Sequence, residues 1–356
     1  MKSVLVIGTG TIGEPLIGLL SRMRQEIGIR NVFFHKRTPL KEEYAKVESL
    51  ISQDANLVVD SDCQEAFLAL GHKPSAVYED ALALCDVIID CTPAGNIAKE
   101  KHYLPLSLRS EKKKVFIAQG SEKGFGVPYG YMLNDEILSE QPDYIQVVSC
   151  NTHAIARLCS VLGKNNNFIS GDFVCIRRAN DPSQDNGFVA SPTVGKHDDD
   201  EFGTHHARDV YDLLKTTCGE KYLNLTSSAL KTNTQYMHSI RFAITLERTL
   251  TLEEVISMMH HDKMIALTHH KSSNRVFSFG RDHGFYGRIY NQVVINQPSI
   301  AVFHEGKRTK VMGFAFTPQD GNSLLSSVAA AAAAVLPNRS SEQLFEPLDK
   351  LLRNYI

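Results

Sequence analysis

VLVIGTGTIG, at Val4–Gly13, is the stretch that decides the fold of the first half of this chain. Its apolar residues predict a short buried strand, three glycines follow directly, and the next residues predict a helix over Glu14–Gln25. G-x-G-x-x-G between a strand and a helix is typical of a dinucleotide-binding βαβ unit. There Gly8 forms the tight turn, Gly10 admits the pyrophosphate and Gly13 permits close helix packing. A glycine-rich turn without a nucleotide is the alternative.

Short apolar runs alternate with amphipathic stretches through the first 150 residues, which predicts βαβ units around a parallel sheet. The runs are almost continuously apolar, as in strands that helices cover on both faces. We expect strands at Ser3–Ile7, Val32–Phe34, Val87–Cys91, Val115–Ala118 and Ile145–Ser149. The pattern therefore predicts an α/β fold with a Rossmann dinucleotide-binding domain over residues 1–149.

The sequence after residue 150 mixes helical and strand patterns, which predicts an α+β catalytic domain over residues 150–317. Asn180–Gly203 is a loop-rich segment, longer than an ordinary connection. Thr251 and Glu254 form a capping-box pattern at a helix start. We expect helices at residues 152–162, 206–214 and 324–336, and strands at residues 173–177 and 239–246.

The chain has 356 residues, of which 43% are hydrophobic and 22% charged, and its formal net charge is -2. These values suit a globular protein of about two domains, and the balanced charge offers no basic field for nucleic acid. Seven cysteines without a C-x-x-C pair indicate reduced thiols. With no apolar leader and no apolar run of about 18 residues, we expect a cytoplasmic protein without a membrane partner.

Two cations stand where the dinucleotide fingerprint usually has a carboxylate for the ribose hydroxyls. Lys36 and Arg37 follow the second predicted strand, and a cation suits a 2′-phosphate. NADP is therefore the favoured cofactor, and NAD is the alternative. The other interpretation of Lys36 and Arg37 is that they are solvated turn residues. The carboxyl ends of two later strands, which line the ligand crevice of such sheets, carry Thr92, Pro93, Gln119 and Gly120.

Cys150 differs from the other cysteines because it lies where a predicted strand ends and a predicted helix begins. A helix N-terminus stabilises negative charge, so we expect its thiolate to form more easily than that of a free cysteine, whose pKa is about 8.5. Cys85, Cys91 and Cys175 lie in apolar runs, and Cys159 lies inside a helix. From spacing alone, a structural cysteine and a nucleophile are equal alternatives.

An ordered set of motifs decides between these alternatives. Ser149-Cys150-Asn151-Thr152, the glycine turn and Asp90-Cys91-Thr92-Pro93 together resemble the archaeal-type (type II) glyceraldehyde-3-phosphate dehydrogenases. The resemblance spans nearly the whole chain. Further similar segments are Gln119–Lys123, Arg177–Ala179 with Asp181-Pro182, His205–Val210, Tyr236–Ile240 and Gln319-Asp320.

The resemblance implies a mechanism and an architecture. Cys150 would attack the aldehyde of glyceraldehyde 3-phosphate, and His238 would act as base while a hydride passes to NADP or NAD. Inorganic phosphate would then cleave the thioester to 1,3-bisphosphoglycerate, or the sequence would run in reverse. The segment from about residue 318 to 356 would return to the dinucleotide domain, in a homotetramer. In isolation, His238 is more typical of a buried structural histidine.

The resemblance also implies binding roles for individual residues. Contacts with substrate or phosphate are implied for Ser149, Asn151, Thr152, Arg177, His205 and His206. Contacts with the cofactor are implied for Thr11, Ile12, Gly120, Arg178 and Gln319.

The chain departs from the family pattern beside two of these motifs. His153-Ala154 replaces threonine and glycine, and Ala207-Arg208 replaces glycine and proline, so substrate size and phosphate handling come into question. Another phosphorylated aldehyde or a semialdehyde as substrate, and a nucleotide-binding regulator without turnover, are the alternatives. We expect no metal, because adjacent histidines such as His260-His261 and His269-His270 are poor ligands for one ion.

Overall fold

The computed structural model describes residues 2–120, 122–180, 186–218, 223–234 and 236–356. Its contacts divide the chain into two compact units. The first unit comprises residues 2–131, 135–147 and 324–348, and the second comprises residues 132–134, 148–323 and 349–356. Asp181-Pro182 and Ser121, parts of two sequence motifs, lie outside the described residues.

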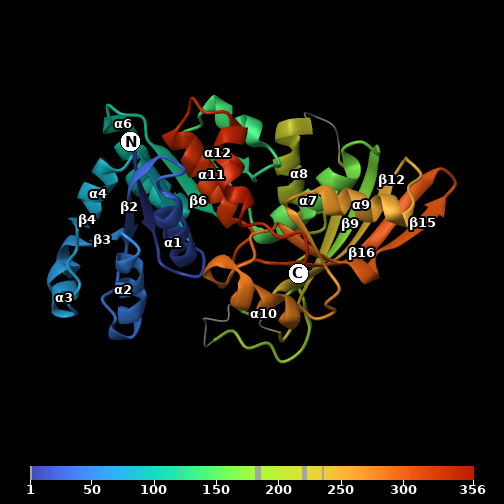
Figure 1. Cartoon of the computed structure of the whole chain (residues 1–356), viewed down its shortest axis with the longest axis horizontal. Helices are drawn as coiled ribbons and strands as arrows, with labels where there is room; N and C mark the ends of the chain where they lie inside the picture. Colours follow the sequence, from blue (N-terminus) through green and yellow to red (C-terminus); the bar gives the residue numbers. More distant parts are fainter. Residues whose placement is uncertain (1, 121, 181–185, 219–222, 235) are drawn as a thin grey trace. The chain divides into compact units, whose positions relative to one another are not determined.

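The first unit is built on a parallel sheet (Figure 1). Its strands are β1 (Lys2–Ile7), β2 (Ile29–His35), β3 (Ala55–Val59), β4 (Ala76–Val77), β5 (Val87–Asp90), β6 (Val115–Gln119), β7 (Val127–Tyr129) and β8 (Tyr144–Val147). They lie in the order β4-β3-β2-β1-β5-β6-β8-β7, and all neighbouring pairs are parallel. The strand before the glycine turn is therefore central in the sheet.

Helices cover this sheet. They are α1 (Gly13–Met23), α2 (Tyr44–Ser52), α3 (Gln64–Ala69), α4 (Tyr78–Leu84), α5 (Gly95–Ala98), α6 (Leu104–Arg109), α11 (Leu324–Val335) and α12 (Ser341–Asp349), of which Asp349 belongs to the second unit. Helix α11 packs against β5, β6 and β8, and its residues 329–332 are fully buried alanines. Small side chains let this helix lie close to the sheet.

The second unit contains a mixed sheet. Its strands are β9 (Phe168–Arg177), β10 (Thr193–Val194), β11 (Leu225–Lys231), β12 (His238–Leu246), β13 (Ile265–Thr268), β14 (Val293–Asn296), β15 (Ala301–Glu305) and β16 (Arg308–Thr317). The main order is β10-β11-β9-β12-β16-β14-β13, and β15 pairs with β16. Among the described strands of this second sheet, only the β9–β11 and β13–β14 pairs are parallel.

Helix α7 (Cys150–Gly163) is the centre of the second unit's core. It packs on β9 and β12 and is flanked by α8 (His205–Cys218) and α9 (Leu252–His261). Phe173 of β9 and Phe242 of β12 are fully buried in this core. A further helix, α10 (Ser273–His283), precedes β14. The thiol segment is thus anchored on the best-packed helix of the unit.

The fold class agrees with the prediction of a Rossmann-like α/β domain and a mixed α+β domain. The five strands predicted in the first half correspond to β1, β2, β5, β6 and β8, and the capping box of Thr251 and Glu254 is present at the start of α9. The prediction misses β3, β4 and β7. Two of these have only two or three residues, and a polar Asn56 interrupts the apolar run of the third.

Four short segments lie in the second unit, although the predicted boundaries assign them to the dinucleotide domain. They are residues 132–134, 148–149, 318–323 and 349–356. Main-chain hydrogen bonds hold the last segment beside β13. The N–H of Leu267 donates to the carbonyl of Asn354, and the N–H of Ile356 donates to the carbonyl of Leu267, each at 2.9 Å.

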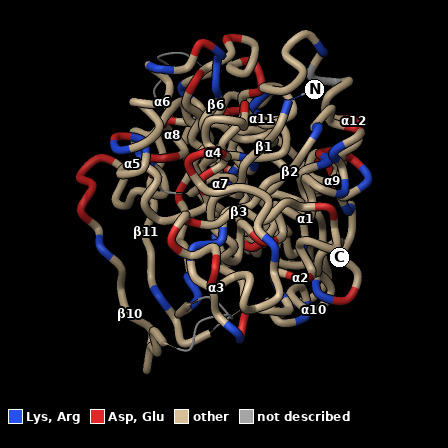
Figure 2. The backbone as a smooth tube through the Cα atoms, turned by 90° about the vertical axis from the view of Figure 1, so that its left-hand side faces the viewer, with Lys and Arg blue, Asp and Glu red and all other residues tan. Residues whose placement is uncertain are grey.

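The charged residues are mixed in sign. Figure 2 shows Lys and Arg interspersed with Asp and Glu along the backbone, as the net charge of -2 leads one to expect. Among the helices of the described residues, none is both long and apolar enough to cross a bilayer.

Candidate functional site

The glycine turn between β1 and α1 has the backbone that its sequence predicts. Gly8 has a positive φ of 93°, and a Cβ on Gly13 would overlap the carbonyl oxygen of Gly8. A Cβ on Gly10 would meet nothing within 4 Å, so this face of the turn is open. No side chain of the described residues caps α1. The N–H of Glu14 donates to the carbonyl of Gly10 at 3.0 Å, and Pro15 has no N–H. Thr11 and Ile12 lie within this turn.

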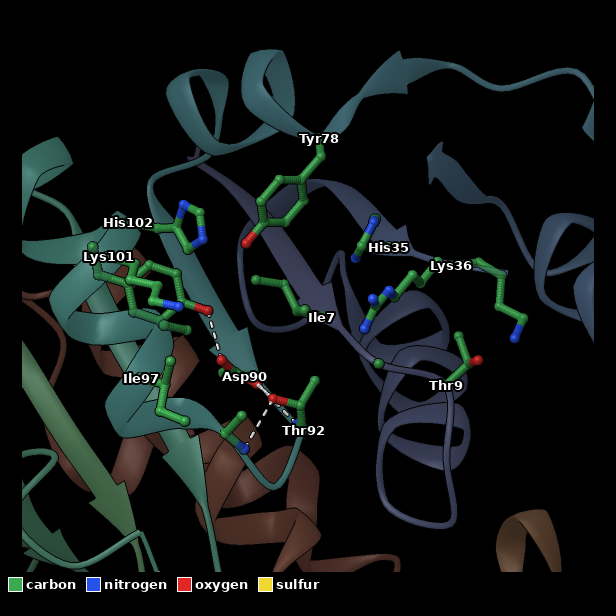
Figure 3. A pocket seen from close by; sticks show the side chains of 15 residues that line it. Ile7, Thr9, His35, Lys36, Tyr78, Asp90, Thr92, Ile97, Lys101 and His102 are labelled. Atoms are coloured by element: carbon green, nitrogen blue, oxygen red, sulfur yellow. Dashed lines mark hydrogen bonds between the residues drawn. The ribbon is translucent and has the colours of Figure 1, made fainter. Parts of the chain in front are cut away.

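A cavity of about 540 Å³ lies beside the turn (Figure 3). The ends of β1, β2 and β5 and the segment 94–103 form its walls. The Asp90 carboxylate lies among the lining residues, and both its oxygens accept hydrogen bonds. Tyr103 donates to Oδ2 at 2.6 Å, while the N–H and hydroxyl of Thr92 donate to Oδ1 at 2.8 and 2.7 Å. Asp90 is thus fixed by its neighbours.

Lys36 and Arg37 both line the cavity, but they differ in their ion pairing. Lys36 forms an ion pair with Glu43, and its side chain extends away from Asp90 and Tyr78 in Figure 3. Arg37 lines the cavity and is exposed. Among the described residues, no ion pair is seen for Arg37.

The predicted wall residues at the strand ends have different surroundings. Thr92 lines the cavity, whereas Pro93 is exposed and does not. Gly120 has a positive φ of 73° just after β6. Gln119 donates from Nε2 to the Ser327 hydroxyl at 2.7 Å, and its buried Oε1 has no hydrogen-bond partner in the described part of the chain. That oxygen is an acceptor open to a ligand.

The cysteine segment begins α7 as predicted. Ser149 is the N-cap, and its hydroxyl accepts from the N–H of Thr152 at 3.4 Å and shares a 2.8 Å hydrogen bond with the Thr152 hydroxyl. Cys150 is the first helical residue and is half-buried. The buried Oδ1 of Asn151 has no partner among the described residues. It is a second acceptor open to a ligand.

Burial reverses the expected acidity of the thiol. It raises the pKa of Cys150 to about 11, although Arg178, the N–H of Asn151 and Arg177 each lower it; Asp320 raises it further. The placement of Cys150 at a helix N-terminus is confirmed, but the expected easy formation of its thiolate is not, because burial raises the pKa of the thiol. The free energy lost by removing the thiolate from water is larger than the stabilisation that the helix N-terminus and the two arginines provide.

His238 is the first residue of β12, and the main chain fixes its ring. The ring Nδ1 accepts a hydrogen bond from the main-chain N–H of Arg178 at 3.0 Å. The main-chain N–H of His238 donates to Oε1 of Gln319 at 2.9 Å. Burial first, and then Arg178, Arg177 and His206, lower the pKa of His238 well below its usual value. The ring is therefore neutral at pH 7, and its proton lies on Nε2 because Nδ1 accepts.

The histidine pair lies at the start of α8. The rings of His205 and His206 are 4.0 Å apart, and His206 is buried whereas His205 is exposed. Burial, followed by His205 and Arg177, lowers the pKa of His206 to about 3. Neither nitrogen of His206 has a partner in the described residues, so its ring is a neutral polar group open to a ligand. The fixed positive charge is that of Arg177.

The two departures from the family pattern have different surroundings. The fully buried His153 shares a 3.0 Å hydrogen bond from Nδ1 with the carbonyl of Ser149, which places its ring inside the first turn of α7. Arg208 forms ion pairs with Asp199 and Glu201 and stacks over Phe202. Both residues support local structure.

Sequence reasoning missed several residues around these groups. The sequence implied only cofactor contacts for Arg178 and Gln319, yet both form hydrogen bonds with His238. Arg178 is also ion-paired with Asp320 at 3.1 Å. In the first unit, Lys101 and His102 line the same cavity as Arg37. The adjacency of Asp320 to Gln319 was an available signal, whereas nothing in the sequence pointed to Lys101 or His102.

The described residues offer one close group of potential metal ligands. Asp60, Asp62 and Cys63 have ligand atoms within 4.8 Å of one another, close to the end of β3. Exposed acidic groups often gather without an ion, and nothing else marks a site there. The neighbouring histidines of the sequence do not form such a group.

Comparisons with known proteins place these features in context. No protein-family model matches the chain. The chain is 28% identical over 314 residues to a glyceraldehyde-3-phosphate dehydrogenase of Metallosphaera sedula, covering 85% of this chain and 84% of that protein. It is 28% identical over 317 residues to the enzyme of that name from Sulfolobus acidocaldarius, covering 83% and 82%, and 26% identical over 278 residues to that from Methanothermus fervidus, covering 75% and 74%. Over most of its length, the chain is therefore similar to proteins named glyceraldehyde-3-phosphate dehydrogenase from several archaea.

Proposed function

We propose that this protein is a phosphorylating glyceraldehyde-3-phosphate dehydrogenase that works through a thioester on Cys150. The observation that carries the proposal is the grouping, within one unit, of the thiol at the start of α7 with a neutral histidine and two arginines. Similarity to archaeal proteins of that name supports the choice of substrate.

The first unit has the features that a nicotinamide dinucleotide requires. The glycine turn leaves a Cβ-free face at Gly10, the helix start is uncapped, and the acceptor of Gln119 is buried without a partner in the described residues. The proposed binding set is completed by Gly8, Gly13, Thr11, Ile12, Thr92 and Gly120, whereas Pro93, which does not line the cavity, is left out of it. When bound, the nicotinamide supplies the hydride acceptor for aldehyde oxidation. We propose NADP as the preferred cofactor, because Arg37 lines the cavity without an anionic partner among the described residues.

The residues of the second unit divide the chemistry among them. Transfer of the thiol proton to solvent gives a Cys150 thiolate, which adds to the aldehyde carbon and leaves an alkoxide on the former carbonyl oxygen. The Nε2–H of His238 is the donor available to stabilise that alkoxide. The base role implied by the resemblance needs the opposite tautomer, so the ring would first have to release the N–H of Arg178.

The substrate anions need donors near the thiol. Arg177 supplies fixed charge, and the uncharged ring of His206, with His205, supplies directional donors and acceptors. Ser149, Asn151 and Thr152 form the helix start that would face the reacting carbon. Inorganic phosphate would attack the thioester carbonyl, and Cys150 would leave as the thiolate.

Cofactor reduction tests this proposal directly. The purified chain is assayed with glyceraldehyde 3-phosphate and each nicotinamide cofactor, with phosphate present or omitted. We expect reduction only with phosphate present, and none in Cys150→Ser. Equal steady-state rates without phosphate would exclude the phosphorylating reaction. A higher kcat/KM for erythrose 4-phosphate or a semialdehyde would assign a different aldehyde.

A further inference from the structure

One turn in the second unit contacts His238, Arg178 and the main chain of Cys150. It is the turn Pro318–Ser323, which follows β16 and is closed by hydrogen bonds to the Pro318 carbonyl from the N–H groups of Gly321 and Asn322, at 2.9 and 2.8 Å. A Cβ on Gly321 would overlap the carbonyl oxygen of Ile289. Only glycine therefore lets the turn enter this closely.

Two side chains of the turn act on the histidine. Gln319 accepts the main-chain N–H of His238 at 2.9 Å. Asp320 accepts two hydrogen bonds from the Arg178 guanidinium, at 3.1 and 3.5 Å. The main-chain N–H of that same arginine donates to Nδ1 of His238. Arg178 thus links the ion pair with Asp320 to the position of the His238 ring.

A third side chain acts on the cysteine. Asn322 is fully buried, and its Nδ2 donates to the carbonyl oxygens of Cys150 and Gln292, each at 2.9 Å. Both amide protons are used, and the first residue of α7 is tied to the strand region that carries Gln292. A carboxylate of the same shape could not make these contacts, because it has no proton to donate.

We propose that Asp320 and Asn322 are positioning residues for the thiol chemistry: Asp320 holds the His238 ring through Arg178, and Asn322 holds the Cys150 main chain. This inference rests on the proposed roles of Cys150 and His238. It adds two residues to which neither the motifs nor the comparisons give a role.

The charges around the thiol make the proposal testable. Arg178, Arg177 and Asp320 face Cys150, and Cys175 lies close enough to interact with it; Arg178, Arg177 and His206 face His238. Asp320 is the only anion in this set. Its removal should favour the thiolate by charge while releasing Arg178 and disturbing the ring, so two measurable quantities should move in opposite directions.

The experiment measures alkylation of Cys150 by iodoacetamide, a neutral reagent, together with aldehyde oxidation. For Asp320→Asn, loss of the anion should lower the thiol pKa and raise the thiolate fraction. Because intrinsic nucleophilicity falls as the pKa falls, we expect alkylation to become about threefold faster. We expect kcat for oxidation to fall at least about tenfold, and Asp320→Glu to return both quantities towards the wild-type values.

A second variant has the opposite sign. Asn322→Asp keeps the side-chain shape but adds an anion near the thiol, so alkylation should slow about threefold while oxidation again falls. Asp262→Asn is the matched control, because Asp262 pairs with the buried Arg157 at 3.3 Å and does not face Cys150. It should leave the alkylation rate unchanged.

Each outcome decides a separate question. A change in alkylation in the same direction in both variants, or unchanged oxidation in either, would refute the positioning roles, because a loosened fold would expose the Cys150 thiol in both variants. If the wild-type chain oxidises none of the aldehydes, the proposed function fails, and the opposite alkylation shifts alone decide whether the charge arrangement is correct.

Discussion

Arg37 and Lys36 are neighbours in sequence, and the structure predicts that only Arg37 selects the cofactor. Lys36 is neutralised by Glu43, which also pairs with Lys46. Arg37 is exposed and lines the cavity. Arg37→Ala should therefore lower kcat/KM for NADP, and Lys36→Ala should have the smaller effect.

The size of the effect follows from the contact that is lost. A hydrogen bond to a charged group contributes about 1.5–3 kcal/mol, and an exposed arginine belongs at the lower end of that range. Since about 1.4 kcal/mol corresponds to a factor of ten, Arg37→Ala should reduce kcat/KM for NADP about tenfold. The value for NAD should stay within about twofold. Glu43→Gln should raise the preference for NADP, because it releases Lys36.

The assay compares both cofactors with a single aldehyde at fixed ionic strength. Arg30→Ala is the matched control, since Arg30 is an exposed arginine near the opposite end of β2. Equal losses in Lys36→Ala and Arg37→Ala would refute this reasoning. So would a loss with NAD as large as that with NADP.

Three further predictions concern the thiol, an acidic group and the glycine turn. Alkylation of Cys150 should rise about tenfold per pH unit from pH 7 to 10, because its pKa is about 11; a plateau below pH 9 would contradict this. Hydrogen bonds from Arg208 are the main reason why the pKa of Asp199 is lowered to about 2. The resulting stability should be present above about pH 4 and lost towards pH 2, and Asp199→Asn should flatten urea midpoints over that range. Gly13→Ala should lower both Tm and cofactor affinity, whereas Gly10→Ala should weaken cofactor binding at unchanged Tm.

Local sequence patterns predicted the strands of the first unit better than those of the second. β1, β5 and β6 are continuous apolar runs, and such runs can be recognised from composition alone. β11 alternates buried and exposed residues and contains serines, lysine and threonine, so its sequence resembles a loop until a sheet forms around it. Such a strand cannot be recognised from its own apolar pattern, and the apolar runs of β13 and β14 were missed as well because each has only four residues.

The candidate site shows the same division. The place of Cys150 at a strand-to-helix junction is a local property and was predictable. Its raised pKa arises from burial by the surrounding unit, and the contacts of Asp320 and Asn322 join residues more than a hundred positions apart. The Lys36–Glu43 pair spans only seven positions, but it requires the turn after β2 to bring the two side chains together. Charge compensation of this kind is invisible in a residue count.

The division of the chain between the two units has a consequence for synthesis. Residues 324–348 complete the first unit and residues 349–356 complete the second, although both sheets begin much earlier in the chain. A nascent chain that emerges from its N-terminus must therefore keep β5, β6 and β8 without α11, and β13 without its last neighbour, until these late residues have been made. Vectorial, domain-by-domain folding is not open to this protein, and its dependence on chaperones should be greatest just before translation of residues 324–356 is finished.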